Sequence, residues 1–142
     1  MMMQERPAAI ARIRGSHIAG TVKFWQKPKG VLVVASIQGL PSSTTGIFAF
    51  HIHEGNLCQG EKFSATGSHY NPEGNFHPNH AGDLPPLLSC GGSAYLALLT
   101  DRFTLKEILG RTIVIHSEPD DFHSQPAGNA GHKIACGIIC PM

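Results

Sequence analysis

Short apolar runs, each ended by turn-forming residues, occupy most of the chain. Residues 8–13 are mostly apolar, residues 17–25 alternate between apolar and polar positions, and residues 31–37 are rich in β-branched side chains. Alternation and β-branched runs of this length are typical of β-strands. Lys27–Gly30 separates the second run from the third and predicts a hairpin turn.

Four further runs predict strands later in the chain, and a single segment hints at a helix. The strands are expected at Ile47–His53, Ala94–Asp101, Ile113–His116 and Lys133–Ile139. Leu105–Leu109 has a helical pattern, but it is too short to change the fold class.

Two long segments carry no sustained periodicity. Glu54–Ser93 is rich in Gly, Pro, Asn and His, and Ser117–His132 is similar in character. Loops this long in a compact domain are usually functional. The pattern therefore predicts an all-β, antiparallel sandwich or barrel that carries its chemistry on two long loops.

Length and composition fit a single compact domain. The chain has 142 residues, of which 42% are hydrophobic and 15% charged, and we expect an N-terminal tail at residues 1–7 and a single domain at 8–142. Its apolar stretches fall well short of the ~20 residues that cross a bilayer, so no membrane partner is expected. The 11 basic and 10 acidic residues give no basic surplus, which argues against nucleic acid as a partner.

The N-terminal segment shows no apolar stretch before a small-residue cleavage site, so the sequence predicts no signal peptide. A cytoplasmic location is the first expectation. An exported mature form, with its leader already removed, is the alternative.

Histidine is the residue that points to chemistry, with nine in the chain. His51 and His53 alternate with Phe50 and Ile52, so the two imidazoles face the same side of a strand, about 6–7 Å apart along the backbone. Such a pair can converge on one metal ion. His116 ends a β-branched strand; on its own it is better interpreted as a strand-end residue than as a ligand, but together with the other histidines it completes a set.

The first long loop adds a second cluster. It contains three histidines and an aspartate within fifteen residues: His69, His77, His80 and Asp83. The segment is polar, so a role in the hydrophobic core does not explain them. Three imidazoles and one carboxylate make a closed tetrahedral shell, which suits zinc at about 2.0–2.2 Å. The alternative is a solvated, histidine-rich loop.

Several motifs, in order along the chain, resemble the copper/zinc superoxide dismutase family. They are Phe50-His51-Ile52-His53-Glu54-Gly55, His69-Tyr70-Asn71-Pro72, His80-Ala81-Gly82-Asp83, Gly110-Arg111-Thr112-Ile113-Val114-Ile115-His116, and Gly128-Asn129-Ala130-Gly131 leading to Ala135-Cys136-Gly137. The resemblance runs from about Ala8 to Ile139. It implies an eight-stranded antiparallel Greek-key barrel or sandwich, immunoglobulin-like in architecture.

The resemblance also implies an activity and a role for each site residue. The activity is superoxide dismutation to O2 and H2O2, with copper cycling between Cu(II) and Cu(I) and a structural zinc. The implied copper ligands are His51, His53, His69 and His116, and the implied zinc ligands are His69, His77, His80 and Asp83. His69 would bridge the two metals, Asp120 would hydrogen-bond the distal nitrogens of His51 and His77, and Cys58 and Cys136 would form a disulfide.

One position departs from the family. The family has an arginine three residues before the second disulfide cysteine, where it attracts superoxide, and here that position is Lys133. Lysine keeps the charge but lacks the planar fork that docks an anion through two parallel donors. We therefore expect activity, at a lower level.

Two short spacings also depart from the family. Four residues separate His53 from Cys58, which removes a segment of the eukaryotic dimer contact, so a homodimer is left open but not through that interface. His77 lies only three residues before His80, which makes it the least typical zinc ligand. Cys90 and Cys140 have no family counterpart and could be a second disulfide or free thiols.

Two other functions compete with dismutation. The first is a copper- and zinc-binding protein of the same fold with weak or no turnover, which Lys133 keeps open. The second is a zinc hydrolase with an open three-histidine site, which the absence of a His-Glu-x-x-His pairing disfavours.

Overall fold

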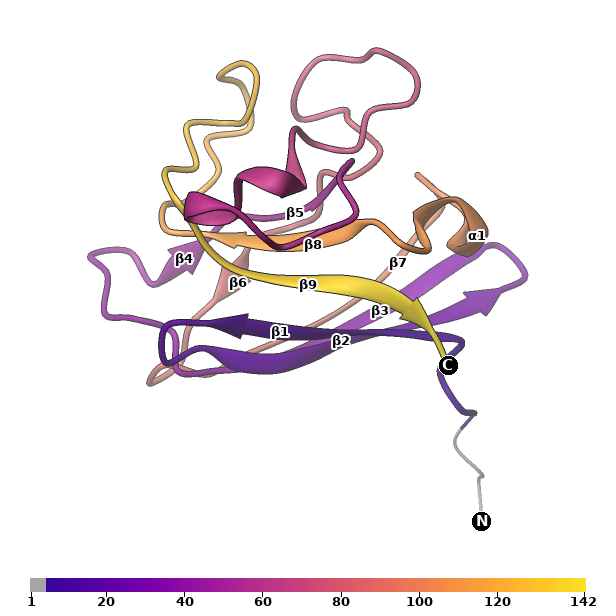
Figure 1. Ribbon diagram of the computed structural model, residues 1–142, viewed down its shortest axis with the longest axis horizontal. Helices are drawn as coiled ribbons and strands as arrows, with labels where there is room; N and C mark the ends of the chain where they lie inside the picture. Colours follow the sequence, from indigo (N-terminus) through magenta and orange to yellow (C-terminus); the bar gives the residue numbers. More distant parts are fainter. Residues whose placement is uncertain (1–4) are drawn as a thin grey trace.

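Antiparallel strands make up almost all of the regular structure in the computed structural model, which describes residues 5–142 (Figure 1). The first four residues of the predicted tail at residues 1–7 lie outside this description. In chain order, the elements are β1 (Ala9–Gly15), β2 (Ala19–Lys27), β3 (Gly30–Gln38), β4 (Ile47–Phe48), β5 (Phe50–His53), the 3₁₀ helix η1 (Glu61–Thr66), β6 (Leu87–Leu88), β7 (Ala94–Thr100), α1 (Leu105–Ile108), β8 (Thr112–His116) and β9 (Lys133–Pro141).

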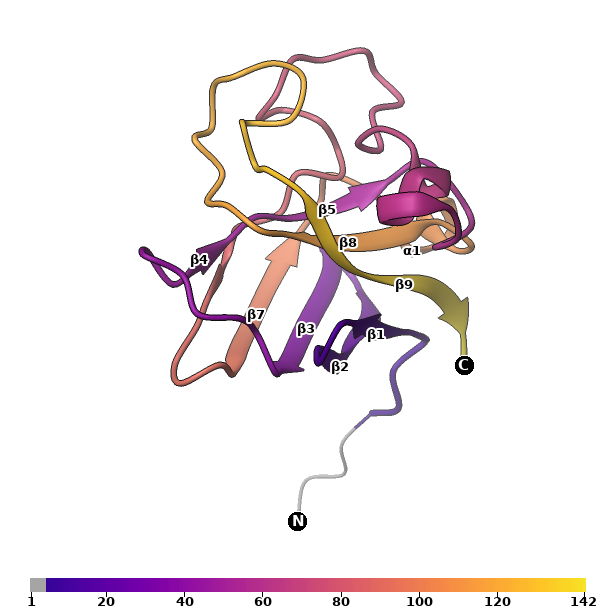
Figure 2. The same cartoon turned by 60° about the vertical axis from the view of Figure 1, so that its left-hand side comes forward.

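Seven strands form one sheet in the order β5-β8-β9-β1-β2-β3-β7. The chain leaves β3, builds β4 to β6, and returns to place β7 beside β3, which is a Greek-key type of connection. A separate short ladder pairs β4 with β6. Because β4 leads into β5 and β6 precedes β7, this ladder brings the two edges of the curled sheet toward each other (Figure 2).

The predicted all-β antiparallel fold is confirmed, with one difference in the number of strands. We expected a single strand at 47–53, but it is interrupted at Ala49, whose N–H donates to Glu118 O at 3.0 Å rather than to a neighbouring strand. The interruption divides the strand into β4 and β5, and β6 is a further strand that the pattern did not predict, so residues 5–142 contain nine strands where the family resemblance implied eight.

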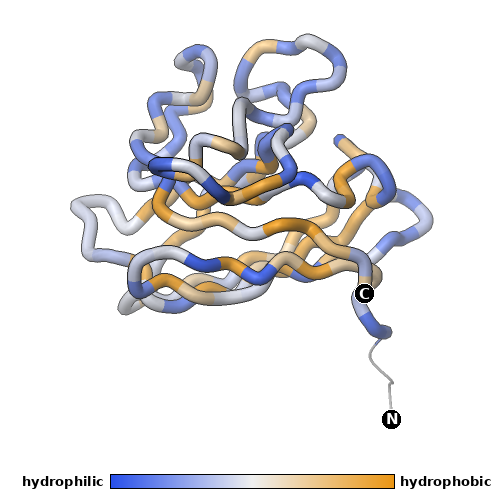
Figure 3. The backbone as a smooth tube through the Cα atoms, viewed as in Figure 1, coloured by the Kyte–Doolittle hydropathy of each residue, from blue (hydrophilic) through white to orange (hydrophobic). Residues whose placement is uncertain are grey.

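The alternation of apolar and polar positions in the sequence corresponds to an alternation of buried and more exposed side chains along the strands. In β3, Val31, Val33, Ala35 and Ile37 are fully buried, whereas the intervening side chains are only partly so. The predicted hairpin is present, with Lys27 paired to Gly30 across the turn. Apolar residues therefore line the inside of the curled sheet, and Figure 3 shows them along the strands, with polar residues concentrated in the loops.

The first long loop contains more structure than the sequence predicted, because η1 and β6 both lie within 54–93. The weak helical signal near residue 105 is a real one-turn helix, α1, closed by a capping box. Thr104 Oγ1 accepts from Glu107 N at 3.4 Å, and the Glu107 carboxylate accepts from Thr104 N at 2.8 Å. Both long loops rise from the same end of the barrel, above β5 and β8 (Figure 1).

Across residues 5–142, we find no helix with the length and apolar character needed to cross a membrane.

The β6 ladder gives a matched test of the inward-facing side chains. Leu87 is fully buried, whereas its neighbour Leu88 is 69% exposed. Leu87→Ala should lower the free energy of unfolding by about 2–5 kcal/mol, since it opens a cavity in the core. Leu88→Ala should change it by less than about 0.5 kcal/mol. Denaturant melts of the two variants measure the difference, and equal effects would contradict the assigned faces.

Candidate metal centre

Six histidines and two aspartates gather at the loop end of the barrel, and all of them are buried. His51 and His53 come from β5, His116 ends β8, and the first long loop and the second contribute the others. The eight side chains are those of His51, His53, His69, His77, His80, Asp83, His116 and Asp120, none more than 8% exposed.

Backbone hydrogen bonds of Ile52 bring the loop residues to the strand residues. Ile52 O accepts from Tyr70 N at 2.8 Å, and Ile52 N donates to Gly82 O at 2.8 Å. Gly82 N in turn donates to Tyr70 O at 2.9 Å. These bonds place His69 opposite His53, and Asp83 opposite His51, as isolated antiparallel pairs.

Gly82 is required for this close approach. A Cβ atom at position 82 would lie 2.3 Å from Ile52 O, which is well inside contact distance. Any side chain there would push the loop away from β5 and separate the two groups of ligands.

The first group of nitrogens belongs to His51, His53, His69 and His116. One nitrogen from each lies within 4.8 Å of all the others. His116 Nε2 is 3.1 Å from His51 Nδ1 and 3.2 Å from His53 Nε2. His53 Nδ1 lies 2.8 Å from Gly67 O, to which it donates, and this leaves Nε2 as the lone-pair donor that faces the group.

The second group surrounds the Asp83 carboxylate. Asp83 Oδ1 is 2.8 Å from His69 Nδ1, and Oδ2 is 2.9 Å from His77 Nδ1 and 3.2 Å from His80 Nδ1. By distance alone, His51 also falls close to His69, His77 and Asp83. However, His51 Nδ1 faces His116 in the first group, and His51 Nε2 is hydrogen-bonded to Asp120. His80 is therefore the chemically suitable fourth member of the second group.

Two buried nitrogens in these groups lack a hydrogen-bond partner among residues 5–142. They are His69 Nε2, which faces the first group, and His77 Nδ1, which lies 2.9 Å from Asp83 Oδ2 but without hydrogen-bond geometry. An unpaired buried polar atom costs about 1–3 kcal/mol, so a structure keeps one only for a reason. Metal ions at the two centres would satisfy both atoms, and the donor sets therefore fit metals.

Asp120 connects the two groups through hydrogen bonds to one histidine of each. Its Oδ2 is 2.8 Å from His51 Nε2 and its Oδ1 is 2.7 Å from His77 Nε2. Phe122 N also donates to Oδ1 at 2.8 Å. A carboxylate in this position makes both distal nitrogens donors, which leaves Nδ1 of each ring free for a metal.

The protonation states suit metal binding. Burial lowers the pKa of His53 to about 3 and also lowers the pKa of His51 and of His116, so these imidazoles stay neutral. Burial alone would raise the pKa of Asp83 and Asp120, but hydrogen bonds from the histidines outweigh it and lower both. Neutral imidazoles and ionised carboxylates are the forms that coordinate metals.

A cavity of about 430 Å³ opens onto the first group, and Lys133 lies at its wall beside His53, His69 and His116. Lys133 Nζ donates to Thr66 Oγ1 at 2.7 Å and to Gly67 O at 2.9 Å. Gly67 O therefore accepts from both Lys133 and His53. No pattern in the sequence pointed to Thr66 or Gly67, because their contacts with Lys133 depend on where η1 packs against β9.

The cysteines separate into two kinds. Cys58 and Cys136 form a disulfide, as the family resemblance implied, and it ties the first long loop to β9. Cys90 and Cys140 are exposed free thiols, which resolves the alternatives left open by their spacing. His123 and His132 are exposed and do not line the cavity beside Lys133.

A Greek-key β-barrel that carries two adjoining groups of buried histidine and aspartate side chains is the architecture of a metal-binding protein. The family model described as copper/zinc superoxide dismutase (SODC) matches residues 18–139, and the chain belongs to this family. It is accordingly a superoxide dismutase, an oxidoreductase that acts on superoxide, and its metals are copper and zinc.

Individual relatives agree with this assignment. Superoxide dismutase [Cu-Zn] 2 of Aquifex aeolicus is 37% identical, with 87% of this chain and 80% of the relative covered. The Cu-Zn enzyme of Photobacterium leiognathi is 36% identical, with 97% and 88% covered. Among solved structures, the clock protein EA4 is similar with a TM-score of 0.84, at 34% identity and 100% coverage of both chains.

The lowered histidine pKa values predict how the metal-free protein responds to acid. Unfolded histidine takes up a proton near its ordinary pKa of 6.5, whereas folded His53 does so only near 3. Stability should therefore be constant above pH 6.5 and fall as the pH drops from 6.5 toward 3, because the unfolded chain binds more protons there.

Thermal melts of the metal-free protein across this pH range measure the effect. His123→Gln, which changes an exposed imidazole, is the control and should leave the slope as it is. A melting temperature that stayed level from pH 7 to 4 would contradict the burial of neutral imidazoles.

Proposed function

We propose that copper is held by His51, His53, His69 and His116, that zinc is held by His69, His77, His80 and Asp83, and that His69 bridges the two metals. The observation that carries this assignment is the position of His69 between the two groups. Its Nδ1 lies 2.8 Å from Asp83 Oδ1, and its buried Nε2 has no protein partner among residues 5–142.

Bound copper would supply the one-electron chemistry, alternating between Cu(II) and Cu(I) while one superoxide is oxidised to O2 and a second is reduced to H2O2. The chain's own residues would hold the metal and manage protons. His69 Nε2 is suited to hold a proton for the peroxide product whenever it is not needed as a ligand. Asp83, whose Oδ1 lies 2.8 Å from the other ring nitrogen of His69, would bind the same zinc ion as that nitrogen and so help to keep the ring in place.

Lys133 would attract the anionic substrate to the first group. Its ammonium is fixed by Thr66 and Gly67 rather than extended into solvent, so the charge stays at the cavity wall. Burial lowers the pKa of Lys133, because it removes part of the ammonium from water. A charge in such surroundings is less screened than one at the surface and acts more strongly on an approaching anion.

The competing function is metal binding without useful turnover, and Lys133 is the feature that favours it. Hydrolysis at a zinc site gains no support, since the buried carboxylates Asp83 and Asp120 are both hydrogen-bonded to histidines, which leaves neither of them free to act as a general base. Metal content per chain, measured together with the dismutation rate before and after copper loading, separates dismutation from storage.

His116 offers the sharpest test of the copper site, because it belongs to the first group alone. His51 would be less informative, since its hydrogen bond to Asp120 connects it to His77 in the second group. His116→Ala should abolish dismutation and copper retention while zinc remains bound at the wild-type level. Atomic absorption and a superoxide consumption assay measure both, and full activity in this variant would refute the copper assignment.

Lys133→Arg tests the role of the cation. A second parallel donor to the anion, worth about 1 kcal/mol, should raise kcat/KM by roughly fivefold. Lys133→Met, which keeps the apolar stem without the charge, should lower kcat/KM and reduce its dependence on ionic strength. An unchanged or lower rate for the arginine variant would count against this role.

A further inference from the structure

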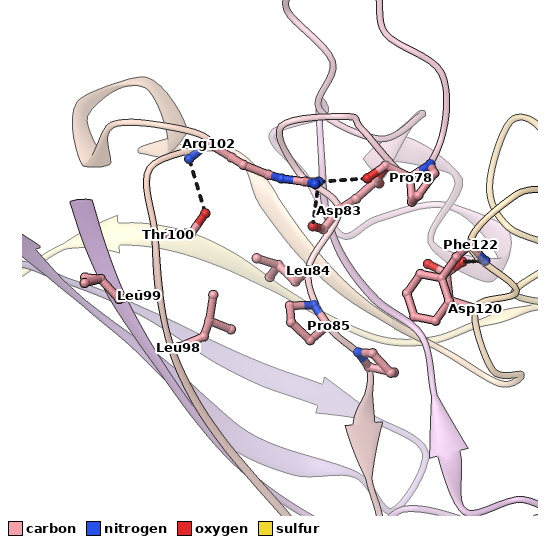
Figure 4. A pocket seen from close by; sticks show the side chains of 11 residues that line it. Pro78, Asp83, Leu84, Pro85, Leu98, Leu99, Thr100, Arg102, Asp120 and Phe122 are labelled. Atoms are coloured by element: carbon pink, nitrogen blue, oxygen red, sulfur yellow. Dashed lines mark hydrogen bonds between the residues drawn. The ribbon is translucent and has the colours of Figure 1, made fainter. Parts of the chain in front are cut away.

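The segment 77–83 carries three of the four ligand side chains of the second group, and on one side it borders a cavity. A cavity of about 420 Å³ lies alongside this segment, lined by Pro78 and Asp83 on one side and by Leu98 and Phe122 on others (Figure 4). Packing density therefore does not fix the segment on this side. Its conformation must depend on specific hydrogen bonds.

Gln125, from the second long loop, hydrogen-bonds both backbone groups of His77. Its Oε1 accepts from His77 N at 2.8 Å, and its Nε2 donates to His77 O at 2.7 Å. Nε2 also donates to His123 O at 2.9 Å, which fixes the amide itself. The backbone of His77 is thus held in two directions, while Asp120 holds the far nitrogen of its ring.

Arg102, between β7 and α1, holds the other side of the segment. Its Nη1 donates to Pro78 O at 2.8 Å, to His80 O at 3.2 Å and to Asp83 O at 3.4 Å. Figure 4 shows the guanidinium reaching the carbonyls of Pro78 and Asp83 at the cavity. One cation thereby gathers three carbonyl groups that flank the metal-facing side chains.

We propose that Gln125 and Arg102 are positioning residues for the zinc half of the centre, clamping the short 77–83 segment so that its donors converge. The proposal rests on the proposed zinc site. Neither side chain contributes an atom to the two groups of ligands, so both act through hydrogen bonds to the backbone of the segment. With only two residues between His77 and His80, the segment has little freedom to correct a displaced ligand, and an external clamp replaces the longer loop.

Both side chains are exposed, so their removal leaves the hydrophobic core intact. Gln125→Ala and Arg102→Ala should each weaken zinc binding by about 10- to 100-fold, the range expected when residues that orient metal ligands are lost. Competition with a chromophoric zinc chelator measures the dissociation constant on the full-length protein. Gln38→Ala and Arg14→Ala, at exposed positions on β3 and β1, are the matched controls and should bind zinc as the wild type does.

Conservative variants test the mechanism of the clamp. Gln125→Glu keeps an acceptor for His77 N–H but loses the donor to His77 O, so it should not restore wild-type affinity. Arg102→Lys keeps a donor and should recover part of the loss. Co²⁺ placed in the zinc site gives an intense visible spectrum when the site is tetrahedral, and this spectrum should weaken or shift in both alanine variants.

The melting temperature of the metal-free protein separates positioning from general stability. Positioning predicts nearly unchanged metal-free melting and a smaller increase on adding zinc. An equal loss of stability with and without zinc, with wild-type zinc affinity and Co²⁺ spectrum, would overturn the clamp. If the wild-type protein itself took up no zinc, the proposed metal assignment would fail instead.

Discussion

The metal centre depends on the two backbone hydrogen bonds through which Ile52 accepts from Tyr70 and donates to Gly82. They fold a loop of about forty residues back onto a four-residue strand. His69 and Asp83 are thereby set opposite His53 and His51, and the remaining contacts of the site follow from that arrangement. This pairing places few demands on the sequence, because it uses backbone atoms at the free edge of β5. The one residue type it requires is a glycine at the closest approach.

Burial then sets the chemistry of the groups brought together. Withdrawing the imidazoles from water keeps them neutral, whereas the carboxylates stay ionised because histidines donate hydrogen bonds to them. The same burial leaves nitrogens on His69 and His77 without partners, a cost that binding of metal would remove. A site assembled this way is less stable in acid when empty, and its stability and its function are set by the same few groups.

The loops that carry this site are held by a disulfide and by hydrogen bonds rather than by hydrophobic packing. The disulfide between Cys58 and Cys136 fixes the first loop to β9, and η1 in that loop receives the ammonium of Lys133. Gln125 and Arg102 act on the 77–83 segment from the second loop and from the end of β7. These bonds lie between elements distant in sequence, so the ligand geometry depends on how the whole loop end is assembled.

The sequence by itself determined the fold class and most of the strands, because alternation in a segment such as residues 31–37 is a local property of the chain. It also supplied the candidate ligands, since His51-Ile52-His53 and the motif ending in Asp83 are contiguous. It could not predict the break at Ala49, the free state of Cys90 and Cys140, or the parts of Gln125, Arg102 and Gly67. Those depend on backbone atoms meeting across long separations, and a backbone carbonyl or amide has the same chemistry in every residue type. Only the tertiary structure decides which of them meet.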